Sequence, residues 1–236
     1  MTSYHGGKKK IGKEIANIIY NTSLDIEDEY DFKIKGYCEP FCGMLGVYQH
    51  IPEFFKNHKP KLKYKAGDIN KSLIMMWEAA QNGWKPPTRR VKKEEFIMLA
   101  GNGKSSAEKG YIGHFYGYMG KYFKPFDNRI TQNNIDNISK NVSYIANNLS
   151  SVKFSYNTYL QYSKLKNYII YCDPPYQIQN YYYNEYNEKL YFEHEKFWDW
   201  CRNMANDNII FVSEYNAPKD FIKIWGKKKE NLYIIY

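Results

Sequence analysis

The sequence has no uninterrupted apolar run near the roughly 20 residues that a membrane-spanning helix needs. Its first 13 residues are polar and basic, and no apolar stretch follows them, so we expect no secretory signal peptide. Only four cysteines are present, and without a signal peptide we expect them to be free thiols in a reducing compartment. These absences argue against a membrane protein and a secreted disulfide scaffold, and they favour a cytoplasmic protein.

Arrangements typical of metal and nucleophile chemistry are also lacking. The five histidines are scattered along the chain, and the pair Cys38 and Cys42 has no second pair that would complete a zinc site. No Gly-x-Gly-x-x-Gly sequence follows a predicted strand, so the dinucleotide-binding fingerprint is missing. We therefore expect no bound metal, and hydrolase chemistry is disfavoured.

Positive charge is present in excess. The chain has 34 Lys and Arg against 25 Asp and Glu, which gives a formal net charge of +9. This balance suits a polyanionic partner such as nucleic acid, although a basic but otherwise ordinary enzyme would fit it equally well. The hydrophobic fraction of 43% is sufficient for a folded core and argues against an intrinsically disordered chain.

Short apolar runs and helical spacings alternate along the chain. Strands are predicted at residues 34–38, 62–66, 152–156, 168–172, 209–213 and 232–236. Helices are predicted at residues 45–55, 70–83, 131–149 and 193–206. This order predicts an α/β fold in which a mostly parallel sheet is covered by helices on both faces.

Residues 82–130 differ from the rest, because they are rich in glycine and proline and show little helical periodicity. We interpret them as an insertion of loops and short strands. The chain is thus predicted to consist of one α/β domain, formed by residues 1–81 and 131–236, and an inserted region, formed by residues 82–130.

Three segments follow predicted strands, at the edge where sheets of this class bind ligands. The first segment contains Gly43 and Gly46, where the backbone can approach a ligand closely. Asp68 follows the next strand, near the offset at which an acidic side chain meets ribose hydroxyls. Asp68 could also be a charge that interacts favourably with a helix N-terminus.

The most specific signal is Asp173-Pro174-Pro175-Tyr176, which directly follows an apolar strand. The two prolines stiffen the loop and fix the direction of the Pro174 carbonyl. The Asp173 carboxylate and this carbonyl could accept both hydrogens of an exocyclic amine, while the Tyr176 ring stacks on the heterocycle. A proline-rich turn with a packed tyrosine is the alternative. The pattern favours a site for a planar amine, with Asp173, Pro174 and Tyr176 as catalytic residues.

Together these motifs resemble those of Dam-type DNA adenine-N6 methyltransferases. Tyr-Cys-Asp-Pro-Pro-Tyr at 171–176 resembles the catalytic motif of that family, and Cys-Glu-Pro-Phe-Cys-Gly at 38–43 resembles its S-adenosylmethionine loop. Residues 4–8 and 66–70 resemble two further cofactor segments, and residues 211–218 are similar to phage and viral members. The resemblance implies a Rossmann-like class I methyltransferase fold and S-adenosylmethionine as the cofactor.

The resemblance also implies roles for single residues. Asp68 would hold the ribose hydroxyls of the cofactor, and Asp173 would contact both its methionine end and the target amine. Two positions depart from the family pattern, because Leu45 stands where a loop glycine is common and Thr158 stands where an aspartate often reads the cofactor adenine. The implied cofactor-binding residues are Tyr4, Gly7, Lys8, Glu39, Pro40, Phe41, Gly43, Gly46, Asp68, Ile69 and Asp173.

The insertion is the region predicted to read DNA. Five basic residues fall within nine positions near its start, and a stretch rich in aromatic residues and glycine follows at 110–126. Such side chains can contact phosphates and stack on bases. The same residues could instead form a solvated charge run beside a small aromatic core. The predicted DNA-binding residues are Lys85, Arg89, Arg90, Lys92, Lys93, Tyr116, Lys121, Lys124 and Arg129.

The sequence thus predicts an enzyme that transfers a methyl group from S-adenosylmethionine to the N6 amino group of adenine in duplex DNA after flipping the base. Methylation of cytosine N4 or of RNA adenine, and a catalytically silent nucleic-acid-binding relative, are the alternatives. The resemblance also suggests a place in restriction–modification, and for a viral protein it suggests the cytoplasm of the host cell. A monomer and a homodimer both remain open.

Overall fold

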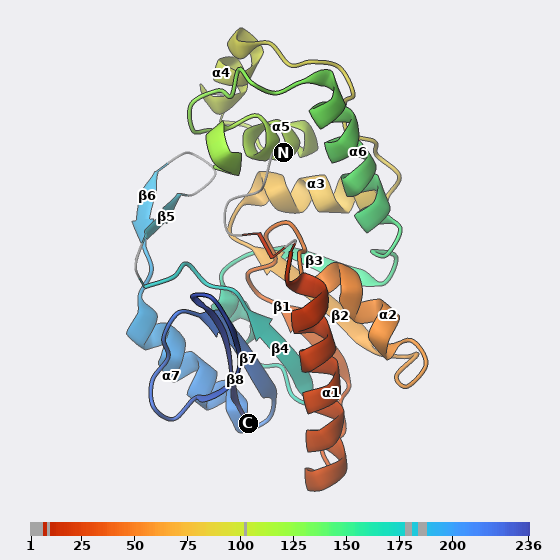
Figure 1. The fold of residues 1–236 in the computed structure, drawn as a ribbon, viewed down its shortest axis with the longest axis vertical. Coiled ribbons are helices and arrows are strands. Elements are labelled where there is room, and N and C mark those ends of the chain that lie inside the picture. The colour runs from red at the N-terminus through yellow and green to blue at the C-terminus, as the bar shows by residue number, and fades with distance from the viewer. Residues whose placement is uncertain (1–6, 9, 102, 178–180, 184–187) are drawn as a thin grey trace.

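A seven-stranded sheet forms the centre of the computed structural model, which describes residues 7–8, 10–101, 103–177, 181–183 and 188–236 (Figure 1). Its order is β3-β2-β1-β4-β7-β9-β8. Every strand is parallel except β9, which pairs antiparallel with both β7 and β8. The strands are β1 (Gly36–Glu39), β2 (Lys63–Asp68), β3 (Val152–Tyr156), β4 (Tyr168–Cys172), β7 (Ile209–Glu214), β8 (Ile222–Lys227) and β9 (Glu230–Ile235).

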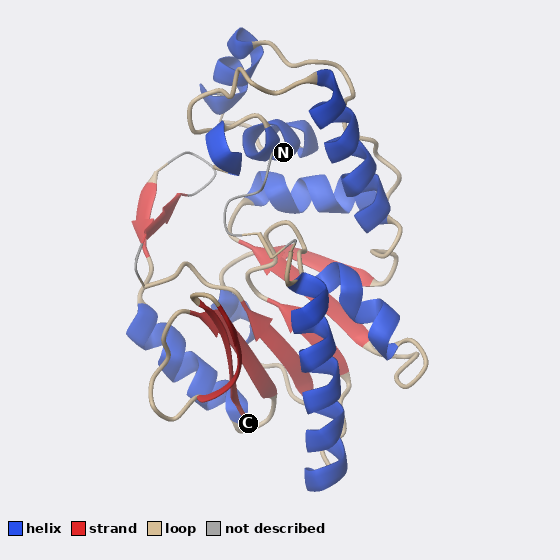
Figure 2. Ribbon diagram, viewed as in Figure 1, coloured by secondary structure: helices blue, strands red, loops and turns tan. Residues whose placement is uncertain are grey.

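The helices cover both faces of this sheet (Figure 2). Successive residues of β4 point to opposite faces of the sheet. Ile169 and Tyr171 pack into one hydrophobic core, together with helices α1, α2, α3 and α6. Ile170 and Cys172 pack into a second core, together with α7. The expected Rossmann-like methyltransferase fold, of class α/β, is confirmed. The helices are α1 (Gly12–Tyr30), α2 (Ile51–Phe55), α3 (Lys71–Gln81), α4 (Lys93–Gly101), α5 (Ala107–Phe115), α6 (Gln132–Ala146) and α7 (His194–Ala205).

The topology also determines where a ligand can bind. From β1 the chain continues outward to β2 and β3, and it then returns to the other side of β1 at β4. The order of strands therefore reverses between β1 and β4, and in open α/β sheets the ligand site lies beyond the carboxyl ends of the strands at such a point. Glu39 ends β1, and Asp173 follows β4 directly.

Two helices begin at caps that the sequence already indicated. The Asn70 side chain accepts a hydrogen bond from the backbone N–H of Leu73 at the start of α3. Thr131 and Asn134 form a reciprocal capping box at the start of α6. Such caps satisfy backbone donors that have no partner within the helix, and each contributes about 1 kcal/mol.

The insertion is helical, so the prediction of loops and short strands at 82–130 is wrong. It contains α4, α5 and the 3-10 helix η2 (Tyr118–Gly120). Glycine often indicates a loop, but here it permits close packing. A Cβ at Gly110 would lie 2.2 Å from the Ser72 carbonyl oxygen of α3, and a Cβ at Gly113 would lie 2.4 Å from the Tyr122 ring. These glycines allow α5 to pack closely against its neighbours. In Figure 1 the insertion lies above the sheet, with α5 above α3 and to the left of α6.

Three further elements were missed or misplaced. No helix was predicted for residues 12–30, where α1 packs Ile15, Ala16 and Ile19 into the core, and no strand was predicted for β8. The helix expected at 45–55 is shorter, because only the 3-10 helix η1 (Tyr48–His50) and α2 are helical there. A separate hairpin joins β5 (Tyr181–Tyr183) and β6 (Lys189–Tyr191).

Candidate active site

A cavity of about 890 Å³ lies at the carboxyl ends of β1, β2 and β4 and extends to the insertion. Pro40 is buried and does not line it, and Tyr4 lies outside the described residues. The predicted catalytic residues and most of the predicted cofactor residues therefore share one cavity. Those that line it are Gly7, Lys8, Glu39, Phe41, Gly43, Gly46, Asp68, Ile69, Asp173, Pro174 and Tyr176.

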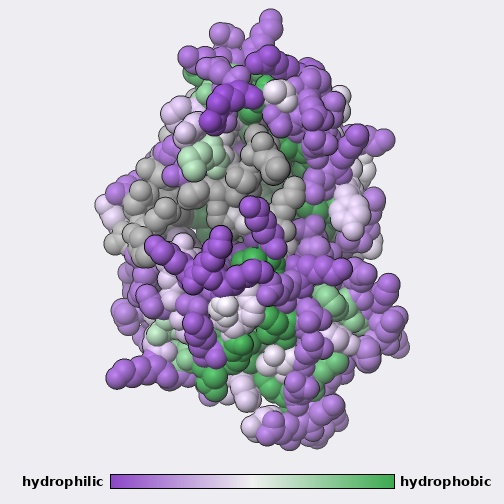
Figure 3. Space-filling model, viewed as in Figure 1, coloured by the Kyte–Doolittle hydropathy of each residue, from purple (hydrophilic) through white to green (hydrophobic). Residues whose placement is uncertain are grey.

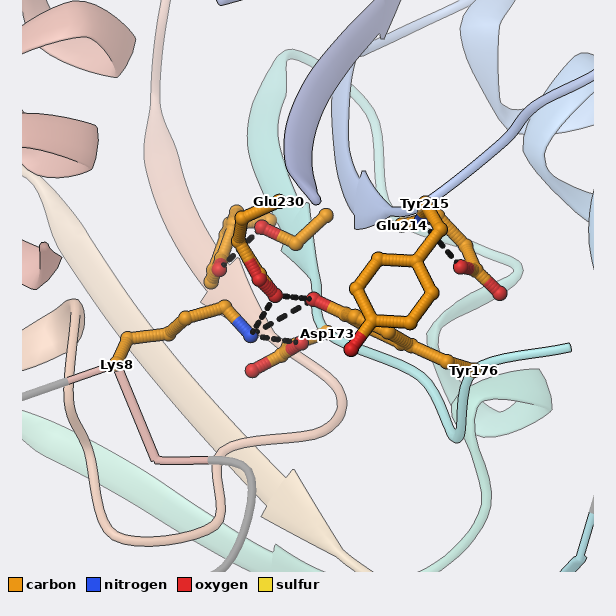
Figure 4. Close-up of polar contacts among 8 residues, drawn as sticks. Lys8, Asp173, Tyr176, Glu214, Tyr215 and Glu230 are labelled. Carbon is orange, nitrogen blue, oxygen red and sulfur yellow. Dashed lines mark hydrogen bonds and ion pairs between the residues drawn. The ribbon is translucent and has the colours of Figure 1, made fainter. Parts of the chain in front are cut away.

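The ammonium group of Lys8 lies among three side-chain oxygens near the predicted catalytic motif (Figure 4). Its Nζ lies 2.7 Å from Oδ1 of Asp173 and donates to the Tyr176 hydroxyl at 2.8 Å. Glu230 contributes the third oxygen, because its Oε1 lies 3.4 Å from Lys8 Nζ and accepts a hydrogen bond from the Tyr176 hydroxyl at 2.5 Å. Four side chains from distant parts of the chain thus form one hydrogen-bonded group.

Burial and charge act against each other within this group. Burial alone would lower the pKa of Lys8, but the carboxylates of Asp173 and Glu230 raise it above its ordinary value, so Lys8 is a cation at neutral pH. Burial raises the pKa of Asp173, and the charge of Lys8 opposes that rise. A carboxylate held in this way is a stronger proton acceptor than one in water.

Two further side chains hold the loop that follows β4. His194, the first residue of α7, lies with Nε2 2.8 Å from the Pro175 carbonyl oxygen. Because a carbonyl only accepts, Nε2 carries the proton. Glu214 at the end of β7 accepts from the backbone N–H of Gln177 at 2.6 Å and from that of Tyr215 at 2.5 Å. The loop is therefore fixed on both sides of Tyr176.

The carbonyl of Pro174 remains available as an acceptor. Pro174 is buried and lines the cavity, and no hydrogen bond to its carbonyl oxygen is found within the described part of the chain. The Tyr176 ring also lines the cavity and packs edge-on against Tyr215, with the ring centroids 4.8 Å apart. An acceptor carbonyl, a carboxylate and two aromatic rings thus border the same space.

Asp68 joins the loops that follow β1 and β2. Its carboxylate accepts from the backbone N–H of Gly43 at 3.1 Å and from that of Asn70 at 2.9 Å. The Trp77 indole donates to the Gly43 carbonyl at 2.9 Å. Burial raises the pKa of Asp68, and the backbone donors oppose that rise. A carboxylate has about four acceptor positions, so Asp68 can still accept from a ligand hydroxyl.

The loop after β1 needs left-handed backbone at two positions. Gly43 has φ 45° and Leu45 has φ 55°. Leu45 stands where the family often has glycine, and it adopts the conformation that glycine adopts most easily, at a cost of about 1–2 kcal/mol. Its side chain is fully buried, which offsets this cost. At Gly46 an added Cβ would lie 3.0 Å from the Lys8 backbone nitrogen, so this residue permits close approach of the N-terminal segment.

Glu39 is a buried acid beside the Asp173 carboxylate. It is 2% exposed, and the Tyr37 hydroxyl donates to its Oε1 at 2.7 Å. Burial raises the pKa of Glu39 to about 8. The side chain is therefore mostly protonated at neutral pH, and a positively charged ligand group at this point would favour its ionised form.

The insertion forms the opposite wall of the cavity. His114, Tyr118, Lys121 and Lys124 line it from this side. Burial lowers the pKa of His114 to about 3, so its imidazole is neutral at physiological pH. Of the predicted DNA-binding residues, Lys121 and Lys124 thus lie at the cavity.

Three predicted DNA-binding residues have other partners. Tyr116 is 1% exposed and donates its hydroxyl to the Arg89 carbonyl, so its ring belongs to the core of the insertion. The Arg89 guanidinium is exposed but donates to both oxygens of Glu95. Arg129 is paired with Asp127 and lies over the exposed Tyr118 ring, 4.8 Å from its centroid.

The remaining predicted contacts, Lys85, Arg90, Lys92 and Lys93, are exposed on the insertion. Figure 3 shows that hydrophilic side chains cover most of this upper part of the molecule. The surface is therefore compatible with a polyanionic partner, and the aromatic residues are divided between an inner core and a few exposed positions.

Glu230, His194 and Glu214 were not identified from the sequence. Glu230 ends a lysine run, and His194 was one of five scattered histidines. No local spacing marks them, because each reaches the loop after β4 from another element of the fold. Glu214 lies within residues 211–218, whose resemblance to viral relatives was the one available signal.

Within the described residues, no three His, Cys, Asp or Glu side chains lie close enough together to hold a metal ion. No helix there is long and apolar enough to span a membrane. The four cysteines are buried and unpaired.

Comparison with known proteins gave one family and several solved structures. No curated protein matches the sequence. Two structures of the rRNA methyltransferase aviRa from Streptomyces viridochromogenes are similar, with 10% and 9% sequence identity and TM-scores of 0.40 and 0.42. Each comparison covers 94% of this chain and 84% of the other.

The family match is to D12 class N6 adenine-specific DNA methyltransferases, and it extends over residues 98–235. This stretch is more than half of the chain and contains the Asp173–Tyr176 motif, whereas the segments around Lys8, Gly43 and Asp68 precede it. The protein therefore belongs to the family of D12 class N6 adenine-specific DNA methyltransferases.

Proposed function

We propose that this protein uses S-adenosylmethionine to methylate N6 of an adenine that has been flipped out of duplex DNA. One observation carries the proposal: the Asp173 carboxylate and the Pro174 carbonyl border the same cavity as the glycine loop after β1 and the Asp68 carboxylate after β2. A site for an exocyclic amine thus lies next to a site suited to a nucleoside cofactor.

The donor set of the cavity fits S-adenosylmethionine. Asp68 suits the ribose hydroxyls, and Lys8 suits the carboxylate of the methionine end. Glu39 suits the α-ammonium group, which would favour ionisation of this buried acid. When bound, the cofactor supplies an electrophilic methyl group on a sulfonium centre. The cavity volume of about 890 Å³ leaves room for an extruded base beside it.

The residues after β4 would act on the target nitrogen. The lone pair of an adenine N6 is delocalised into the ring, which makes the amine a poor nucleophile. Asp173 and the Pro174 carbonyl would each accept one N–H, which draws the nitrogen toward tetrahedral geometry and localises the lone pair. This is catalysis by positioning and preorganised electrostatics. After transfer the nitrogen must lose a proton, and the raised pKa of Asp173 makes its carboxylate a suitable acceptor.

Aromatic rings would hold the extruded base. N6 is paired inside a duplex, so the base must leave the stack, at a cost of a few kcal/mol. A ring such as that of Tyr176 can return about 1–3 kcal/mol by stacking. Hydrogen bonds from the Tyr176 hydroxyl to Glu230, and from Lys8 to that hydroxyl, orient the ring before the base arrives.

The experiment is methyl transfer from labelled S-adenosylmethionine to genomic duplex DNA, followed by nucleoside analysis and sequencing of the modified sites. We expect N6-methyladenine. Asp173→Ala should abolish transfer while leaving DNA affinity nearly intact, and more than a few per cent of residual turnover would contradict the role of Asp173. If the product is N4-methylcytosine, or if RNA is methylated in place of duplex DNA, the proposed substrate is wrong. Absence of cofactor binding by calorimetry would indicate a silent relative.

A further inference from the structure

The turn between β8 and β9 is a basic feature that the proposed site does not use. Lys227, Lys228 and Lys229 are consecutive and exposed. Lys227 pairs with Glu230 across the hairpin, so Lys228 and Lys229 form a two-residue loop. Lys228 has φ 60°, a conformation that such turns normally give to glycine or asparagine. A lysine therefore occupies a position where the backbone conformation alone would favour glycine or asparagine.

This turn lies at the catalytic edge of the sheet. Strand β9 runs antiparallel to β7, with Asn231 opposite Glu214, so β9 begins where β7 ends. The next residue after the lysines is Glu230, which lines the cavity and accepts the hydrogen bond from the Tyr176 hydroxyl. In Figure 4 Glu230 reaches toward Lys8 and Asp173 from this side. Lys229 and Lys228 are thus one and two positions before Glu230, which contacts Lys8 and Tyr176.

Most of the charge on the turn is not compensated by the residues that the structure describes. Lys227 pairs with Glu14 at 2.8 Å. Within the described residues, Lys228 and Lys229 have no ion pair. Lys228 and Lys229 do not line the cavity themselves, but they precede Glu230, which does, and the insertion provides Lys121 and Lys124 on the opposite wall. Positive charge therefore lies on both sides of the cavity.

We propose that Lys228 and Lys229 form a second phosphate-contacting surface for the DNA substrate, on the side of the target base away from the insertion. The proposal rests on the proposed function, since a base extruded into the cavity leaves backbone phosphates on both sides of it. Contacts of this kind carry no sequence information, and they position the duplex over the site.

A double variant that keeps the turn tests the proposal. Lys228→Gly with Lys229→Ser removes two charges and provides a favourable turn sequence, so it should fold. The matched control is Lys56→Ala with Lys61→Ala, which also removes two exposed lysines but near the amino end of β2, at the opposite edge of the sheet. Duplex DNA binding is measured by titration over a range of salt concentrations, and turnover is measured at saturating DNA.

We expect the turn variant to weaken duplex binding on the order of tenfold and to reduce the slope of log K against log salt by about two, while turnover at saturating DNA stays within about twofold. The control should change both binding quantities much less. Equal effects of the two variants would overturn the proposal, because net charge would then explain them. Binding is independent of methyl transfer, so a wild-type protein that binds DNA without methylating adenine would refute the proposed function alone. A wild-type protein that does not bind duplex DNA would overturn both.

Discussion

The ammonium of Lys8 lies 2.7 Å from Oδ1 of Asp173, although the two residues are 165 positions apart in the sequence. The N-terminal segment therefore contributes a cation to the loop after β4, in the position where the target amine of the proposed reaction would meet the Asp173 carboxylate. In the proposed reaction the carboxylate of the cofactor would compete for Lys8, which would leave Asp173 free to accept from the amine. Cofactor binding and exposure of the catalytic acceptor are in this way linked through one side chain.

Replacing Lys8 should destabilise the fold. Lys8→Met removes the cation between Asp173 and Glu230 and leaves two largely buried carboxylates without a partner, which typically costs about 3–5 kcal/mol. Urea denaturation at neutral pH measures the loss. Adding Glu230→Gln to Lys8→Met should recover part of it, because one unpaired charge is then removed. A double variant as unstable as the single one would contradict this account.

Glu39 should make stability depend on pH. Its pKa is raised from 4.5 to about 8, so the folded protein holds a proton that the unfolded chain has released. The contribution of this proton to the free energy of unfolding is therefore fully present below about pH 4.5. It is lost as the pH rises toward 8, and the loss amounts to several kcal/mol, at most about 5 kcal/mol. Glu39→Gln cannot titrate, so its free energy of unfolding should exceed that of the wild type at pH 8 and approach it below about pH 4.5. Parallel stability curves for the two proteins would refute the prediction.

Thr158 lines the cavity at the end of β3, where the family resemblance places an adenine-reading aspartate. Thr158→Asp would add a charged acceptor for the exocyclic amine of the cofactor, and a hydrogen bond to a charged group contributes about 1.5–3 kcal/mol. We expect S-adenosylmethionine to bind about tenfold more tightly by calorimetry. Thr158→Ala serves as the control and should change affinity little. Unchanged or weaker binding to Thr158→Asp would place the cofactor adenine elsewhere.

His194 should affect turnover through the loop that it holds. His194→Phe removes the hydrogen bond to the Pro175 carbonyl and allows the adjacent Pro174 carbonyl to move, so kcat should fall about tenfold while KM for DNA stays within about twofold. His194→Gln keeps an N–H donor and should restore part of kcat. If the two substitutions lower kcat equally, or if KM changes instead, His194 does not act by positioning this loop.

The parts of the fold that follow local rules could be predicted from the sequence. Five of the six expected strands, 34–38, 62–66, 152–156, 168–172 and 209–213, correspond closely to observed ones, because buried strands are short apolar runs and their ends are marked by glycine, proline and aspartate. The prediction for 232–236 found the later part of β9. What failed was the interpretation of glycine in the insertion, since Gly110 permits close packing of α5 against α3, and Gly113 makes room for the rings of Tyr122 and Phe123.

The sequence by itself determined that Asp173, Pro174 and Tyr176 follow a buried strand, since a short apolar run and the prolines after it are local features of a few positions. Only the tertiary structure decided what surrounds them. Lys8, His194, Glu214 and Glu230 reach this loop from the N-terminal segment, α7, β7 and β9. These four side chains come together because of the strand order and because β9 lies antiparallel between β7 and β8. Contacts between residues so distant along the chain leave no periodic pattern in the sequence.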